Sequence, residues 1–163
     1  MISANPPVLW LTPFGQATQY ATIHDMEGFK VFISHSAEDA WVAQQIGRRI
    51  REDCGAMTFL DVDDIAVGDN FMQRLHQELL SAQELVALFT PWSARRPWVW
   101  IEIGAAWVQK KRVVAVLYGL TIEQFEVVTE GKGIFEELHI LQLNDFNRYL
   151  NELRSRVAEV NDD

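Results

Sequence analysis

The chain has 163 residues, the size of one ordinary domain, and 48% of them are hydrophobic, which is enough for a buried core. Its 23 acidic and 14 basic residues give a net charge of −9, which disfavours binding to the phosphate backbone of long nucleic acids. The longest apolar run, Val113 to Leu120, is too short to span a bilayer, and the single cysteine, Cys54, excludes an intrachain disulfide. We therefore expect a cytoplasmic protein that contacts neither nucleic acid nor membrane directly.

Residues 1–28 show no sustained periodicity, and we interpret them as an N-terminal extension of a domain that spans 29–160. Within the domain, five short β-rich or continuously apolar runs are predicted as strands: 29–33, 57–60, 85–89, 113–117 and 138–143. Segments with apolar residues three or four positions apart are predicted as helices: 37–54, Asn70 through Leu79, 98–110 and 146–157. Residues 119–136 are predicted to be irregular or briefly helical.

Strands that alternate with helices require crossover connections, which give a parallel sheet covered on both faces. The sequence therefore predicts an α/β fold, a flavodoxin-like doubly wound sandwich with a five-stranded parallel sheet. Ligands of such sheets bind at the carboxyl ends of the strands, near the topological switch point. The loops of interest are therefore 34–39, 61–68 and 90–98.

The first of these loops begins with Ser34-His35-Ser36. Ser36 is followed three residues later by Asp39, which approximates a capping box, so we expect the Ser36 hydroxyl to cap the next helix. Free amides at a helix N-terminus also attract phosphate, so capping is compatible with ligand contact. No carboxylate is placed by the sequence to orient His35, and a loop histidine is usually solvated.

The second loop, 61–69, contains four aspartates. It lacks the glycine and glutamate spacing of a calcium loop, so we interpret it as a solvated acidic loop and predict no metal site. Asp61, at the end of a strand, also invites comparison with phospho-accepting receiver domains. Their acceptor follows the third strand, however, where this chain has Thr90-Pro91.

Residues 91–120 carry five basic residues and one acidic residue, and they hold four of the six tryptophans. Trp98 and the acidic residue, Glu102, are four positions apart and therefore share one face of a helix. Two interpretations of Glu102 remain open. It forms an ion pair with Arg95, Arg96 or Arg112, or it lies in a partly desolvated, aromatic-walled cleft where its charge acts strongly.

Taken together, these segments resemble the Toll/interleukin-1 receptor (TIR) domain family over about 29–144. The matching segments follow in chain order: Phe32-Ile33-Ser34-His35-Ser36 with Glu38-Asp39, Phe59-Leu60-Asp61 with Gly68, and Leu85 through Pro91 followed by Ser93, Trp98 and Glu102. The chain departs from the family at Val99, where many members have cysteine, and at the basic pair Arg95-Arg96. The order and separation of the segments carry the resemblance more than any single one.

This resemblance implies a bacterial-type enzyme that cleaves NAD⁺ to nicotinamide and ADP-ribose or a cyclic isomer, with Glu102 as the catalytic residue. Trp98 would form a wall of the nicotinamide-ribose pocket, and the first loop would contact the substrate through Ser34, His35 and Ser36. The diphosphate would be held by Arg95, Arg96 or Lys110. NAD⁺ is the substrate, and no cofactor is expected. The nicotinamide of NAD⁺ is already a cationic leaving group, so no general acid is needed to protonate it. A single carboxylate therefore suffices, whereas ordinary glycosidases need two.

The resemblance also implies self-association through TIR–TIR contacts, with other TIR or sensor proteins as further partners, in bacterial immune signalling such as antiviral defence. We also predict that the acidic second loop of one domain meets the basic residues of 91–120 of a neighbouring domain in a head-to-tail contact. The alternative function is a non-catalytic TIR adaptor or scaffold that acts through such contacts alone. A weaker alternative is a flavin-binding flavodoxin-like protein.

Overall fold

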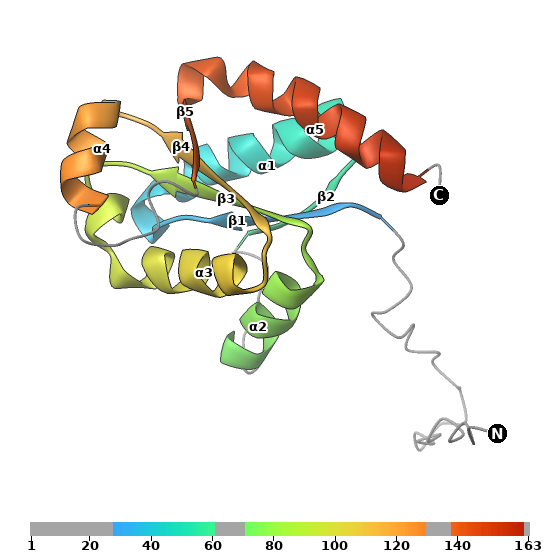
Figure 1. Cartoon of the computed structure of the whole chain (residues 1–163), viewed down its shortest axis with the longest axis horizontal. Coiled ribbons are helices and arrows are strands. Elements are labelled where there is room, and N and C mark those ends of the chain that lie inside the picture. The colour runs from blue at the N-terminus through green and yellow to red at the C-terminus, as the bar shows by residue number, and fades with distance from the viewer. Residues whose placement is uncertain (1–27, 61–70, 130–137, 162–163) are drawn as a thin grey trace.

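The computed structural model describes residues 28–60, 71–129 and 138–161. Its strands form one parallel sheet in the order β2-β1-β3-β4-β5, as Figure 1 shows. The strands are, in chain order, β1 (Lys30–Ser34), β2 (Met57–Leu60), β3 (Glu84–Phe89), β4 (Arg112–Leu117) and β5 (His139–Gln142). This confirms the predicted flavodoxin-like doubly wound sheet, whose topological switch point lies between β1 and β3.

Helices cover both faces of the sheet (Figure 1). Helices α1 and α5 pack on one face, and α2 and α3 pack on the other, while α4 lies near the carboxyl edge of the sheet. The bounds of the helices are α1 (Ala40–Cys54), α2 (Phe71–Ser81), α3 (Pro97–Val108), α4 (Ile122–Thr129) and α5 (Phe146–Asn161). No helix in these described ranges is long and apolar enough to cross a membrane.

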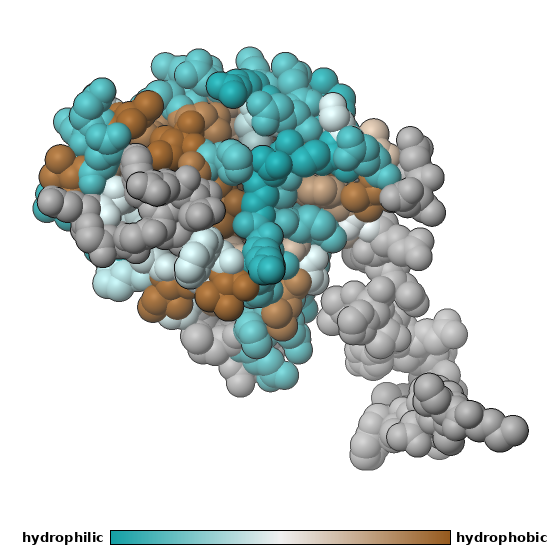
Figure 2. All heavy atoms as spheres, in the orientation of Figure 1, coloured by the Kyte–Doolittle hydropathy of each residue, from teal (hydrophilic) through white to brown (hydrophobic). Residues whose placement is uncertain are grey.

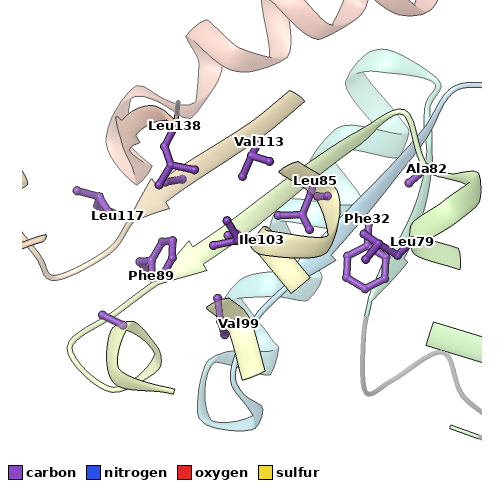
Figure 3. Packing of buried hydrophobic residues seen from close by; sticks show 14 of the residues in the cluster. Phe32, Leu79, Ala82, Leu85, Phe89, Val99, Ile103, Val113, Leu117 and Leu138 are labelled. Atoms are coloured by element: carbon purple, nitrogen blue, oxygen red, sulfur yellow. The ribbon is translucent and has the colours of Figure 1, made fainter. Parts of the chain in front are cut away.

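The strand side chains alternate between two hydrophobic clusters, one on each face. Phe32, Leu85 and Phe89 point toward α2 and α3, where they meet residues such as Leu79 and Ile103 (Figure 3). The intervening residues of the same strands, including Val31, Ile33, Val86 and Leu88, pack against α1 and α5. Strands buried on both faces explain why β3 and β4 are continuously apolar runs in the sequence.

Helix α1 packs closely on the sheet at Gly47. A Cβ atom at this position would lie 3.1 Å from Leu60 Cδ1 and 3.2 Å from Ile33 Cδ1, so even alanine would force neighbouring side chains to move. The helix ends at Gly55, as the sequence predicts, because this residue adopts the left-handed conformation (φ 71°) and its amide donates to the Arg51 carbonyl at 3.0 Å.

Among the element boundaries that differ from the sequence predictions, two have a clear structural cause. The predicted helix 37–54 is interrupted: a 3₁₀ turn (Ala37–Asp39) precedes α1. Helix α3 ends at Val108 and not at Lys110, because Lys110 adopts a left-handed conformation with φ 57°. Helix α4 lies in the segment predicted to be irregular or briefly helical. The predicted extension, apart from Gly28, and the acidic second loop lie outside the described residues.

Candidate active site

The candidate site lies at the carboxyl edge of the sheet, where the two central strands end. Ser34 is the last residue of β1, and it is paired in register with Ala87 of the neighbouring strand β3. The chain leaves these two strands in opposite directions, toward α1 on one face and α3 on the other. This divergence creates the crevice in which doubly wound folds bind their ligands.

Glu102 reaches this edge from α3. Its side chain is almost completely buried, with a residue exposure of 2%, and its Oε2 accepts a hydrogen bond from the Ser34 hydroxyl. The two residues are 68 positions apart in the chain, so the fold brings them together. A buried carboxylate oriented by a hydroxyl at the end of a central strand is the central feature of the site.

The sequence of α3 explains why a carboxylate is carried into this position. Pro97 is pre-organised for the first helical turn, and the side chains of Val99 and Ile103 are buried in the cluster between α3 and the sheet. Glu102 directly precedes Ile103 and lies on the same inward side of the helix. Trp98, one turn before Glu102, is partly buried and packs against that cluster, so both predicted residues belong to one face.

His35 follows Ser34 and is also buried, with 2% exposure. The expectation of a solvated loop histidine is therefore wrong. Neither ring nitrogen has a hydrogen-bond partner in the part of the chain that the structure describes. A buried imidazole without partners costs free energy, so this residue is a candidate for contact with a ligand.

Ser36 does not cap a helix, in contrast to the capping-box prediction. Its hydroxyl donates to Asp39 Oδ2 at 2.6 Å, and the Thr90 hydroxyl donates to the same oxygen at 2.8 Å. Because Thr90 follows β3, this buried carboxylate ties the loop after β1 to the loop after β3. Ser93 extends the network by accepting from the Thr90 amide at 2.7 Å and donating to the Leu88 carbonyl at 3.0 Å.

The arginines considered as partners of Glu102 are directed elsewhere. Arg96 forms an exposed ion pair with Glu38 at 2.5 Å, and Arg112 lies 3.6 Å from Glu84 at the opposite edge of the sheet. Arg95 is exposed in the 3₁₀ turn before α3. A backbone hydrogen bond and, more weakly, the charge of Arg96 hold the pKa of Glu38 below its ordinary value.

The structure thus brings Ser34, His35, Ser36, Trp98 and Glu102 to the carboxyl edge, with Arg95 on the surface just before α3. Lys110 is not part of this group, because it follows the far end of α3. Sequence reasoning assigned Asp39 only to a capping box and did not assign a role to Thr90 and Ser93, although Thr90 directly follows a predicted strand. Among the described residues, no three His, Cys, Asp or Glu side chains are grouped so that they could hold a metal ion.

Comparisons with known proteins agree with this architecture. The model of the TIR domain family matches residues 31–154. The TIR domain of the Toll-related receptor TRR-2 from Hydra magnipapillata superposes with a TM-score of 0.56 at 15% identity, covering 80% of this chain and 97% of that one. The TIR domains of the activated Roq1 resistosome, which recognises the pathogen effector XopQ, superpose with a TM-score of 0.51 at 17% identity, covering 78% and 82%.

At these identities the solved structures support the fold alone. No curated protein matches the chain significantly. The family model, however, covers well over half of the sequence, including both β1 and α3. The chain therefore belongs to the TIR domain family.

Proposed function

We propose that this TIR domain cleaves the bond between nicotinamide and ribose in NAD⁺, with Glu102 as its catalytic residue. The observation that carries the proposal is the placement of Glu102: the carboxylate is buried at the switch point of the sheet, it is held by Ser34, and it lies on the helix face that also presents Trp98.

The proposed reaction needs little machinery. The C1′–N bond breaks and its electron pair moves to the pyridinium nitrogen, so nicotinamide leaves as a neutral molecule and positive charge develops on the ribose. Water then adds to C1′ and releases a proton to solvent, giving ADP-ribose; attack by a nucleophile within the same molecule gives a cyclic isomer instead. A fixed negative charge at Glu102 stabilises the developing cation in a site shielded from water.

The neighbouring residues have supporting roles in this proposal. Ser34 fixes the orientation of the carboxylate through its hydrogen bond. His35 and the loop at Ser36 contact the ribose, and the Trp98 indole forms a wall of the nicotinamide pocket. Arg95, which is exposed near the start of α3, is available to pair with the diphosphate.

The test is nicotinamide release from NAD⁺ by concentrated wild-type protein and by the variant Glu102→Gln. The substitution removes the charge and keeps the shape, so we expect release to fall at least about 100-fold. Glu38→Gln is the matched control, because it neutralises an exposed carboxylate near the same loop. Absence of release by the wild type would refute the enzymatic function, and undiminished release by Glu102→Gln would refute the role of Glu102.

A second candidate function is that of a non-catalytic adaptor or scaffold. It is favoured by exposed apolar side chains on α3, namely Ile101, Trp107 and Val108, which are 50 to 74% exposed. In this proposal they contribute to self-association or to contacts with other TIR or sensor proteins, as in bacterial immune signalling. The TIR domains of the activated Roq1 resistosome are an example of TIR domains that are part of a larger assembly. Sedimentation of wild-type protein and of Val108→Ser measures self-association, and so tests whether this surface mediates it independently of the catalytic site.

A further inference from the structure

Two adjoining cavities lie at the amino edge of the sheet, at the opposite end of the strands from Glu102. One, of about 260 Å³, lies against α5, and the other, of about 370 Å³, lies against the turn between α3 and β4. They share Arg112 at the start of β4, His139 at the start of β5 and Leu138 directly before it. We call them the amino-edge cavities.

The charged side chains that line the amino-edge cavities are mainly cationic, although the whole chain has a charge of −9. Five lysines and arginines contribute, against one carboxylate, Glu152: they are Lys110, Lys111, Arg112, Arg148 and Arg156. A second carboxylate, Glu84, is buried behind them. Figure 2 shows the corresponding surface as a strongly hydrophilic band that runs from α5 toward the start of β4. Positive charge concentrated in a hollow attracts a small anion.

Not all of these cations are available to a ligand. Arg156 is occupied by Glu84, to which it donates from Nε at 2.5 Å, and Arg148 lies 3.3 Å from Glu152. The Lys111 ammonium donates to the carbonyl of Leu80 at 2.9 Å; burial lowers its pKa.

The polar contacts of Arg112 are longer than the contact between Arg156 and Glu84. Its Nε is 3.6 Å from Glu84, and its Nη1 is 3.4 Å from His139 Nε2. A guanidinium directed at an imidazole in a hollow retains N–H groups for an acceptor that lies between the two elements. Arg112 and Lys110 are therefore the cations best placed to bind an anion.

The backbone at Lys110 provides an independent observation. Lys110 is the one non-glycine residue with positive φ among the described residues, and it ends α3 in a Schellman motif: its amide donates to the Trp107 carbonyl at 2.8 Å, and the Lys111 amide donates to the Ala106 carbonyl at 3.0 Å. Glycine is strongly favoured at this position because a Cβ atom destabilises the left-handed conformation. A lysine that occupies a glycine position at the rim of a cationic hollow points to a requirement for its side chain.

The cavity wall beside Lys110 and Arg112 also contains apolar and aromatic side chains. Trp107 is half exposed and lines the same cavity as Lys110, and Val113 and Leu138 complete the apolar lining. A flat indole beside two cations matches a ligand that combines a planar ring with phosphate. We propose that the amino-edge cavities bind a nucleotide: Lys110 and Arg112 hold its phosphates, and Trp107 contacts its base.

The test is calorimetric titration of the full chain with ADP and, separately, with inorganic pyrophosphate. ADP carries no nicotinamide and is not a substrate of the proposed reaction, so its binding is measured without turnover. We expect saturable binding of ADP, and weaker binding of pyrophosphate because it lacks a base. Lys110→Gly and Arg112→Gln each remove one charge-assisted contact and should weaken ADP binding about tenfold.

Lys110→Gly is the sharper variant, because the same substitution should raise the melting temperature by relieving the left-handed lysine. Loss of ADP binding therefore cannot be ascribed to misfolding. Arg48→Gln, at an exposed arginine of α1 outside both sites, is the matched control and should leave ADP binding unchanged. Arg95→Gln reports any ADP that binds at the carboxyl edge instead. No saturable binding to the wild type, or binding that Arg95→Gln weakens and Lys110→Gly does not, would overturn the proposal. Pyrophosphate binding as tight as that of ADP would overturn the assignment of a nucleotide.

Discussion

Two buried polar side chains, Glu84 at the amino edge of the sheet and His35 at the carboxyl edge, differ in how their polar atoms are paired. At the amino edge, the carboxylate of Glu84 is 2% exposed and well supplied with donors: Arg156 bonds to both of its oxygens, and the Tyr149 hydroxyl donates to Oε2 at 3.0 Å. At the carboxyl edge, His35 is equally buried, yet its ring nitrogens have no partner among the described residues. The Glu84 carboxylate therefore stabilises the fold, whereas His35 is a candidate for contact with a ligand.

The largest effect on stability is expected from Glu84→Ala. Removing this carboxylate leaves Arg156 and Arg112 without their buried counter-charge, so the free energy of unfolding should fall by about 3 kcal/mol. Denaturant unfolding measures this change. Glu126→Ala, an exposed residue of α4, is the control and should change stability by less than about 0.5 kcal/mol. If the fold is retained, nicotinamide release per folded molecule should be unaffected; a selective loss would show that the two edges are not independent.

A smaller effect is expected from Tyr149 under alkaline conditions. Burial and the adjacent Glu84 carboxylate raise the pKa of Tyr149 well above its ordinary value. Above about pH 10 the unfolded chain loses this proton while the folded chain keeps it, so stability should decline by up to about 1.4 kcal/mol per pH unit until the folded group titrates. Tyr149→Phe should flatten the decline, as measured by unfolding between pH 9 and 11 (about one unit either side of the ordinary pKa). An unchanged slope would contradict this assignment.

The smallest and most informative effect is expected from His35→Leu. Replacing a buried imidazole without partners by an apolar side chain should raise the free energy of unfolding by about 1 kcal/mol and reduce nicotinamide release. A gain in stability with a loss of activity is the signature of a residue retained for function. The exposed His76 of α2 provides the control, His76→Leu. A marked destabilisation by His35→Leu would show that the histidine supports the fold after all.

The fold could be predicted from the sequence because each element has a local pattern. The strands β3 and β4 are uninterrupted apolar runs, and α1 repeats an apolar residue every four positions until Gly55. Even so, the pattern could not separate the 3₁₀ turn before α1 from the helix itself. Nor could it place the end of α3, because a lysine in the left-handed conformation is not expected from residue preferences.

The site could be predicted only in part, because its contacts are long-range. The spacing of Trp98 and Glu102 places both on one helix face, but whether Glu102 meets an arginine or a hydroxyl depends on the strand order, which brings Ser34 to it. For the same reason the burial of His35 was not foreseen. The sequence analysis also named Lys110 beside Arg95 as a residue that would hold the diphosphate. Helix α3, about 18 Å long, separates the two residues, so they lie at different edges of the sheet.

The parallel pairing of the strands has a consequence for folding kinetics. Each of the four strand pairs requires a crossover, so none of them forms as a local hairpin, and the chain belongs among slower-folding topologies with many non-local contacts. The hydrogen bond from Ser34 to Glu102 joins a strand and a helix separated by two intervening helices and two strands. It can form only after the central strands have paired and α3 has docked. Recovery of the carboxyl-edge site during refolding would therefore mark a late event, after the topology of the sheet has been established.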